Sequence, residues 1–375
     1  MITLRYHFVA MAAVFLALAV GVVLGSTTAA ERFLAGIGDG GPSSTEQLTN
    51  LENERDDLAA RLRDAEAFAV ALAPRIVAGS LDGQRVALLS TVDADAADRD
   101  AVRELIGAAG GTVSGEIQLT DGFTDPARAD QLRELVRGVL PAGVRLPSAV
   151  DPGTLAGGLL GALLLTDPET DEPQASATES AAALGGLVDG GFVQAGGEVE
   201  PARLVVVIDG GVSAANAAGD RAAVVARLAA QLDRSGAGAV LAGRAGSATG
   251  QGSVGLVRAD RAVADILSTV DDVERPAGRI AVVLALREQN EGAAGQYGVA
   301  EGARAPVPEA SPAAADTGSA DTGPADDTGP ADTRSADDAG PANTGPADGS
   351  GPADGSAEES DAAPFDDAAV VVGGG

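Results

Sequence analysis

The pattern of apolar and polar positions begins with a long segment that carries no charge. It runs from Phe8 to Leu24 and, with Gly25 to Thr28, reaches about 20 residues, enough to cross about 30 Å of hydrocarbon as a helix. Arg5 and the free amino terminus precede it. The positive-inside rule therefore predicts a single-pass anchor in the cell membrane, with the N-terminus cytoplasmic and the bulk of the chain extracytoplasmic.

A cleaved signal peptide is the alternative interpretation of this segment. A short basic start, an apolar run and small residues at 28–30 fit that pattern too. The run is longer than the core of a usual signal peptide, which favours a retained helix in contact with membrane lipid. Gly21 and Gly25 form a GxxxG pair that lets two helix backbones approach closely, although glycine is also common in single membrane helices.

A second pattern begins after a stretch rich in Gly, Pro and Ser at 36–44. Apolar residues return in alternating steps of three and four, and Arg55 occupies the one seam position that is not apolar. The seam residues are Leu48, Leu51, Leu58, Leu62, Ala65, Ala69, Leu72 and Ile76. This spacing is typical of a coiled coil, and on a tethered chain it predicts a parallel homodimer. A single helix folding back on its own domain would show the same pattern.

Beyond Pro74 short apolar runs alternate with amphipathic stretches. Strands are expected at 85–91, 112–119, 159–166, 203–209 and 239–242, and helices at 96–109, 125–140, 180–189 and 220–234. Strands without polar alternation, separated by helices, are typical of a parallel sheet covered on both faces. The pattern therefore predicts an α/β fold with a doubly wound, mostly parallel sheet.

A final change of pattern occurs at Glu301, where the composition shifts to Ala, Asp, Pro, Gly, Ser and Thr. Such a segment buries too little apolar surface to offset its chain entropy, and we expect it to be disordered. Taken together, the patterns predict a stub and transmembrane helix at 1–30, a linker at 31–45, a coiled coil at 46–78, an extracytoplasmic α/β domain at 79–300 and a disordered acidic tail at 301–375.

Composition narrows the classes of function. The formal charge of -30 would repel phosphate backbones, which argues against nucleic acid as a partner. The chain has no cysteine, so disulfides, thiolate metal sites and cysteine nucleophiles are excluded. Its one histidine, His7, precedes the apolar segment, so no Ser-His-Asp arrangement can form outside the membrane. We therefore predict a protein that is not an enzyme and has no catalytic, cofactor-binding or metal-binding residue.

Two glycine motifs deserve comparison with ligand-binding loops. The GxGxxG at Gly250, Gly252 and Gly255 overlaps an expected strand at 253–257 and so does not fit a nucleotide fingerprint. The sequence Asp209-Gly210-Gly211 ends a strand where open α/β sheets bind ligands, but a simple turn is the favoured interpretation.

Two blocks of sequence, one near each end of the expected ordered region, carry a family resemblance. The first is MITLRYH followed by AAVFLALAVGVVLGS at 12–26, and the second is STVDDVERPAGRIAVVLALREQNEGAAGQYG at 268–298. The specific residues of the second block are Val270, Asp271, Pro276, Ala277, Gly278, Leu284, Ala285, Leu286, Glu288, Gln289, Tyr297 and Gly298. On these residues the chain resembles the mycobacterial copper transport protein B (MctB) family of actinobacterial envelope proteins over roughly residues 1–300.

The resemblance implies a role in copper export or copper homeostasis, with a channel in the outer envelope. Under the name SteB, the same family is described as a partner of a septation protein that controls cell-wall cleavage. Copper prefers soft or imidazole ligands, and this chain offers only Met1, His7 and Met11. From the resemblance, we expect a membrane-anchored, non-enzymatic protein of copper homeostasis, although few residues could bind copper directly. The alternative is a dimeric coiled-coil scaffold that binds and regulates cell-division or wall-hydrolase machinery.

Overall fold

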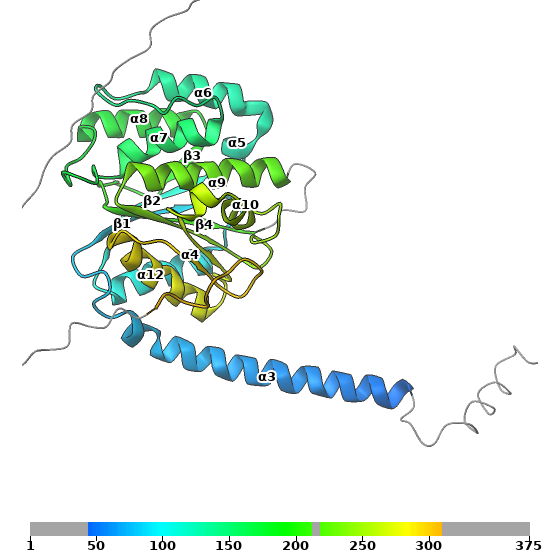
Figure 1. Ribbon diagram of the computed structural model, residues 1–375. Coiled ribbons are helices and arrows are strands. Elements are labelled where there is room, and N and C mark those ends of the chain that lie inside the picture. Colours follow the sequence, from blue (N-terminus) through cyan, green and yellow to red (C-terminus); the bar gives the residue numbers. More distant parts are fainter. Residues whose placement is uncertain (1–43, 212–217, 310–375) are drawn as a thin grey trace, which may run out of the picture. The chain divides into compact units, whose positions relative to one another are not determined.

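A seven-stranded sheet in the order β3-β2-β1-β4-β5-β6-β7 forms the centre of the computed structural model, which describes residues 44–211 and 218–309 (Figure 1). The strands are β1 (Arg85–Ser90), β2 (Thr112–Leu119), β3 (Val193–Ala195), β4 (Leu204–Asp209), β5 (Gly238–Gly243), β6 (Ser268–Asp271) and β7 (Gln296–Tyr297). All neighbouring strands pair in parallel except β2 and β3, which are antiparallel. The prediction of an α/β fold with a mostly parallel sheet is confirmed.

Helices cover both faces of this sheet (Figure 1). One face carries α4 (Ala96–Ala108) and α12 (Pro276–Asn290). The other face carries α5 (Asp121–Thr124), the 3-10 turn η1 (Pro126–Arg128), α6 (Ala129–Gly138), α7 (Pro152–Leu164), α8 (Ala177–Asp189), α9 (Ala218–Ser235), α10 (Ser253–Ala259) and α11 (Arg261–Ala264). The chain adds β2 on one side of β1 and β4 on the other, so the winding reverses between β1 and β4.

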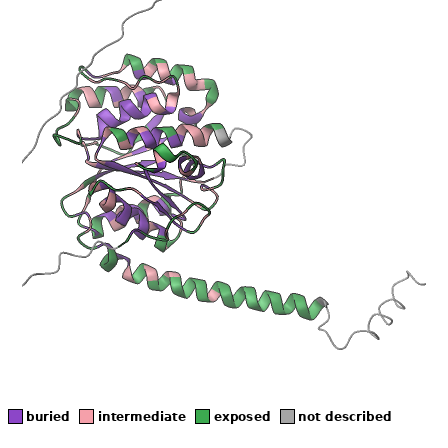
Figure 2. Cartoon of the chain, in the orientation of Figure 1, coloured by how far each residue is buried: buried purple, intermediate pink, exposed green. Residues whose placement is uncertain are grey.

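Strand β4 shows why the central strands carry no polar alternation. All of its residues are buried, because alternate side chains enter different cores. Leu204, Val206 and Ile208 pack under α4 and α12, whereas Val205 and Val207 pack under the helices of the opposite face. Figure 2 shows the buried sheet between exposed outer helix surfaces. A strand buried on both sides is apolar on both faces, and in β4 only the last residue, Asp209, is polar.

The expected strand at 159–166 is wrong, because helix α7 extends over 152–164. Its start is encoded by Asp151, whose side chain accepts a 2.8 Å hydrogen bond from the Thr154 amide, and by Pro152 in the first turn. The apolar run after it is buried on all sides, so it shows no helical period. Of the expected strand, only Leu165 and Thr166, which follow α7, form isolated β-bridges, with Ala202 and Pro173 of the same chain.

The expected strand at 253–257 is also wrong, since these residues form the start of α10. Gly252 is the N-cap residue, so the glycine motif does precede a helix, although one of only 7 residues. The expected helix at 125–140 is shortened: the Asp125 side chain caps η1 through the Ala127 amide at 2.9 Å, and α6 begins at Ala129.

Helix α3 (Ser44–Val77) covers most of the segment in which we expect a coiled coil. Its last turns contact α4 and α12, where Ala73 and Val77 are buried and Glu66 lies 3.7 Å from Arg275. The turns before them are mostly exposed (Figure 2).

Two predicted segments fall largely outside the described residues. The expected membrane helix at 8–24 is not described, and of the expected tail at 301–375 only residues 301–309 are described. In that part, the amides of Arg304 and Ala305 donate hydrogen bonds to the Gln296 carbonyl of β7. Within 44–211 and 218–309, no helix combines the length and the apolar content that crossing a bilayer requires.

Candidate functional site

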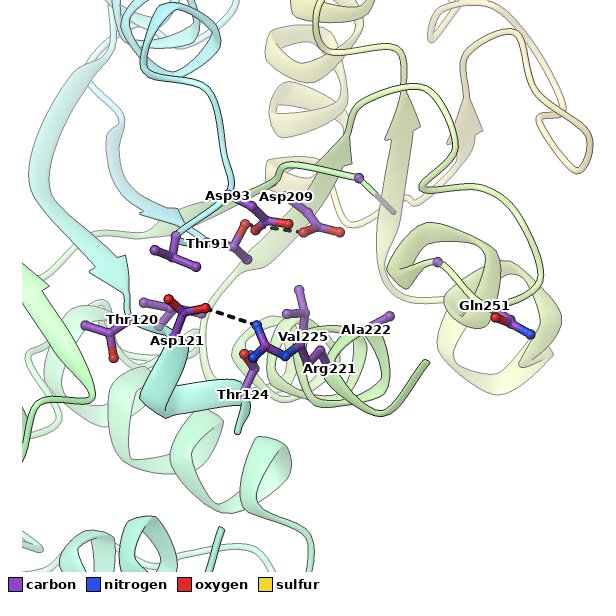
Figure 3. A pocket seen from close by; sticks show the side chains of 14 residues that line it. Thr91, Asp93, Thr120, Asp121, Thr124, Asp209, Arg221, Ala222, Val225 and Gln251 are labelled. Atoms are coloured by element: carbon purple, nitrogen blue, oxygen red, sulfur yellow. Dashed lines mark hydrogen bonds and ion pairs between the residues drawn. The ribbon is translucent and has the colours of Figure 1, made fainter. Parts of the chain in front are cut away.

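A cavity of about 130 Å³ lies at the carboxyl ends of β1, β2 and β4, against α5, α9 and the start of α10 (Figure 3). It occupies the point where the winding of the sheet reverses. In open α/β sheets this switch point is the usual place for a ligand, because the loops from neighbouring strands diverge there. We call it the switch-point cavity.

One wall of the switch-point cavity is acidic. Asp209, the last residue of β4, is buried and accepts hydrogen bonds from Ser253 and, at 3.3 Å, from the Thr91 hydroxyl. Burial, with a smaller contribution from the nearby Asp93 carboxylate, raises the pKa of Asp209 to about 6, although the hydrogen bonds from Ser253, Thr91 and Gly210 lower it in part. No arginine forms an ion pair with Asp209 within the described part of the chain. Its negative charge is therefore stabilised by the hydroxyl groups of Thr91 and Ser253 and by the Gly210 amide.

The opposite wall carries a guanidinium. Arg221, from the first turns of α9, places Nη1 3.0 Å from Oδ1 of Asp121 in α5. The Nε atom of Arg221 is buried, and its hydrogen has no acceptor among the residues that the structure describes. Figure 3 shows this pair across the cavity from Asp93 and Asp209. The cavity is thus bipolar, with an excess of negative charge.

A second charged cluster lies at the same edge of the sheet, on the face of α4 and α12. Asp98 of α4 is almost fully buried and binds Arg244 Nε at 2.5 Å and Arg279 Nη2 at 2.9 Å. Arg244 also binds Asp95, the N-cap residue of α4, at 2.7 Å. Both oxygens of Asp98 are satisfied, so this cluster joins α4, α12 and the loop after β5 and leaves no group free for a ligand.

The block at 268–298, which carries the family resemblance, closes the far edge of the sheet. Asp271 binds Arg258 at 2.7 Å in a buried ion pair and accepts hydrogen bonds from the amides of Val299 and Ala300. Gly298 has φ +128°, and a side chain there would overlap the Asp271 carboxylate. These residues have structural roles.

The contact residues predicted from the sequence do not lie in the switch-point cavity. The seam residues lie on α3, where Leu48, Leu51, Leu58 and Leu62 are 61, 62, 57 and 42% exposed. Gly21 and Gly25 lie outside the described residues. None of these lines the switch-point cavity.

Sequence reasoning found the cavity only in part. The Asp209-Gly210-Gly211 turn and Gly252 of the glycine motif both contribute to its lining or support. Asp93, Asp121 and Arg221 were missed, because acidic and basic residues are common throughout the chain. The available signal was that Asp93 and Asp121 each closely follow a strand end.

Across residues 44–211 and 218–309, no group of three or more His, Cys, Asp or Glu side chains is placed to hold a metal ion.

Comparison with known proteins identifies similar chains. A family model described as "Copper transport outer membrane protein, MctB" matches residues 1–308. A copper transporter MctB from Mycobacterium tuberculosis is 39% identical over 308 residues, which cover 81% of this chain and 98% of the relative. A copper transporter MctB from Mycobacterium leprae is 39% identical over 311 residues, with the same two coverages. The matched region includes the undescribed N-terminal segment, α3 and the α/β body.

Proposed function

The chain belongs to the MctB family of copper transport outer membrane proteins, and from this we propose that it acts in copper homeostasis at the cell envelope. The observation that carries the proposal is the extent of the match, which runs from residue 1 to residue 308. A shared body alone would indicate a shared fold. A match that also includes the N-terminal apolar segment and α3 supports a shared placement in the envelope.

We propose that residues 1–30 hold the chain in the cell membrane by one helix, with the N-terminus cytoplasmic. The charge-free run at 8–24 and Arg5 before it support this placement. The α/β domain at 79–300 then lies outside the cytoplasm, beyond the linker and helix α3 (Ser44–Val77). We propose that the expected acidic tail is a disordered spacer beyond residue 309, supported by its low apolar content, since its first residues at 304 and 305 hydrogen-bond to β7.

The protein is proposed to act without catalysing a reaction. Its single histidine lies at position 7, and the switch-point cavity is smaller than the roughly 300 Å³ typical of small-molecule sites. The soft and imidazole donors preferred by copper are confined to Met1, His7 and Met11. The body therefore supports copper homeostasis through its fold and partners rather than through a copper site of its own.

A deletion strain tests this proposal. Deleting the gene should raise cellular copper and reduce growth at elevated copper, and the full chain supplied in trans should restore both. A parallel zinc challenge is the control and should show no difference between the strains. Unchanged copper content and copper tolerance in the deletion strain would remove the copper role.

A dimeric scaffold is a second candidate, supported by the exposed seam of α3. Leucines that are 42 to 62% exposed at coiled-coil spacing cost solvation free energy unless a second helix covers them. A paired helix could present the α/β bodies to cell-division or wall-hydrolase proteins. Crosslinking in cells followed by affinity capture should recover such partners, and their repeated absence would argue against this role.

A further inference from the structure

We propose that Arg55 sets the register in which α3 pairs with a second copy of the chain, by binding Glu54 of that copy. The interaction surface is the seam of α3, and the partner is another α3 helix that runs in the same direction. This inference rests on the dimer proposed above and concerns which alignment of its two helices is stable. Arg55 is the one seam position that is not apolar, and no described residue of the α/β body binds it.

In the single chain, Arg55 is exposed and binds only a neighbour on its own helix. Its Nη2 atom lies 2.7 Å from Oδ1 of Asp56, and the two side chains are 73 and 67% exposed. An ion pair this exposed contributes little to stability and is readily exchanged for another. The Glu54 side chain forms no hydrogen bond or ion pair within the described residues. Both charges are therefore available to a second copy.

The seam on either side of Arg55 is open to a second helix. Leu51 and Leu58, the seam residues before and after Arg55, are 62 and 57% exposed, and the turns of α3 that carry them face solvent (Figure 2). The α/β body buries Ala73 and Val77 at the far end of the helix. A second helix can therefore reach the turns around Arg55 without displacing the body.

Knobs-into-holes packing places Glu54 of one copy beside Arg55 of the other. With Leu48 as heptad position a, Arg55 is also an a position. In a parallel, in-register pair, a side chain at position a enters a hole formed by four residues of the facing helix. For Arg55 these are Leu51, Glu54, Arg55 and Leu58 of the second copy. The two Arg55 side chains share a layer, which costs stability, and Glu54 of the other copy offsets each charge.

Other alignments of the two helices lose this neutralisation. After a shift of one heptad, either Gln47 or Arg61 takes the place of Glu54 in the hole. The amide of Gln47 carries no charge, and Arg61 repels the guanidinium. In an antiparallel pair, a positions face d positions, and every d position of this seam is Leu or Ala. A single polar residue at an a position fixes the register of other coiled coils in the same way, at a cost in stability.

The charges that flank the seam are also complementary to a second copy in this register. A residue at position g faces position e of the following heptad on the other helix, where opposite charges form ion pairs. Arg61 then faces Glu66, whose side chain is 35% exposed. No facing pair combines like charges. The facing pairs are Gln47–Glu52, Glu54–Ala59, Arg61–Glu66 and Phe68–Ala73.

Charge exchange between two differently tagged copies tests the proposal. Both full-length copies carry Leu58→Cys, which reports pairing through a disulfide because the native chain has no cysteine. Arg55→Glu on one copy and Glu54→Arg on the other should each weaken pairing of that copy with itself, because like charges then share the hole. Produced together in one membrane, they should form the mixed dimer in at least about tenfold excess over each homodimer, against about twofold for random pairing.

Two outward positions of the same helix provide the matched control. Arg63→Glu and Asp64→Arg make the same charge changes on neighbouring exposed residues that lie off the seam. With Leu58→Cys in both copies, this pair should give the ratio of random pairing. A general attraction between a more acidic and a more basic copy would instead favour the mixed dimer in the control as well.

A second experiment measures the register directly. Leu51 and Leu58 are separated by seven residues, or about 10 Å along a helix, so Leu51→Cys in one copy and Leu58→Cys in the other form a disulfide only after a shift of one heptad. With Arg55 in place, we expect no such crosslink. Arg55→Leu in both copies should keep the pair, permit the shift and produce this crosslink.

Two results would overturn the proposal and leave the dimer intact. The first is the same ratio of mixed dimer to homodimer in the seam and control pairs. The second is a crosslink between Leu51→Cys and Leu58→Cys copies that retain Arg55. If Leu58→Cys in an otherwise native chain does not crosslink at all, the dimer itself is removed and the proposal with it.

Discussion

A half-buried carboxylate, that of Asp233, makes the stability of this protein depend on pH. Asp233 of α9 accepts a 3.0 Å hydrogen bond from the Ala239 amide. Burial raises its pKa from 3.8 to about 7, although that hydrogen bond and Arg234 lower it in part. The folded state therefore holds the proton more tightly than the unfolded state. The resulting stabilisation is complete below about pH 4 and is lost as the pH rises towards 7.

Asp233→Asn should remove this dependence, because the amide oxygen still accepts from Ala239 and does not ionise. Between about pH 4 and 7, the unfolding free energy of the native chain should fall relative to the variant by at most about 1.4 kcal/mol per pH unit. At pH 8 the variant should be the more stable protein. Urea unfolding followed by circular dichroism measures this, with Asp64→Asn on exposed α3 as the control. Parallel pH profiles for native and Asp233→Asn chains would contradict the assignment.

At the scale of residues, the sequence indicates chemistry only where neighbours in the chain are also neighbours in the site. Asp209 was recognisable because it ends an apolar strand and precedes two glycines. Arg221 lies 100 positions from Asp121, its partner across α9 and α5. Nothing local distinguishes it from the other arginines of the chain, so its role depends on the fold.

At the scale of elements, the contact between α7 and α9 depends on glycines spaced four apart. Gly153, Gly157 and Gly161 of α7 face α9, and a Cβ added at Gly157 would lie 2.8 Å from Cβ of Gln231. Because that Cβ is fixed to the α9 backbone, the two helices would have to separate. Glycine here allows close packing, at the cost of lower helix propensity.

Gly157→Ala should therefore destabilise the protein by about 1–3 kcal/mol through overpacking. The matched control is Gly185→Ala in the middle of α8, where nothing lies within 4 Å of the added Cβ. That control should stabilise the protein by about 0.5–1 kcal/mol, because alanine favours the helix. Urea midpoints measure both changes, and equal shifts of the same sign would show that the α7–α9 contact is not close.

The sequence predicted strand β4 correctly and missed helix α7, and the difference follows from how each is buried. The β4 run LVVVID is short, rich in β-branched residues and bounded by Arg203 and Gly210, so its type follows from local preference. The α7 run of Gly, Ala and Leu is apolar on every side because it lies between the sheet and other helices. Its periodicity is lost through tertiary burial, and only the Asp-Pro start at 151 indicated a helix.

At the scale of the whole molecule, the α/β body does not cover the seam leucines of α3. The body buries Ala73 and Val77 at the end of α3, which lie beside the seam, whereas the seam residue Ile76 is still 47% exposed. Leu58, further along the seam, is 57% exposed. Contact with the chain's own body therefore does not cover the leucines at 48–62, and our proposal is that a second copy covers them.

Cysteine substitution tests that pairing directly, because the native chain contains no cysteine. In a parallel, in-register pair, Leu58 faces its own copy, so Leu58→Cys should form a disulfide-linked dimer when membranes holding the full chain are oxidised. Val70 is 56% exposed on the same helix but lies off the seam, which makes Val70→Cys the matched control. Equal crosslinking of both variants would indicate random collision, and no crosslinking of Leu58→Cys would remove the parallel dimer. Selective crosslinking at Leu58 would support a dimer in which the α3 helices of two chains pair and each chain carries one α/β body.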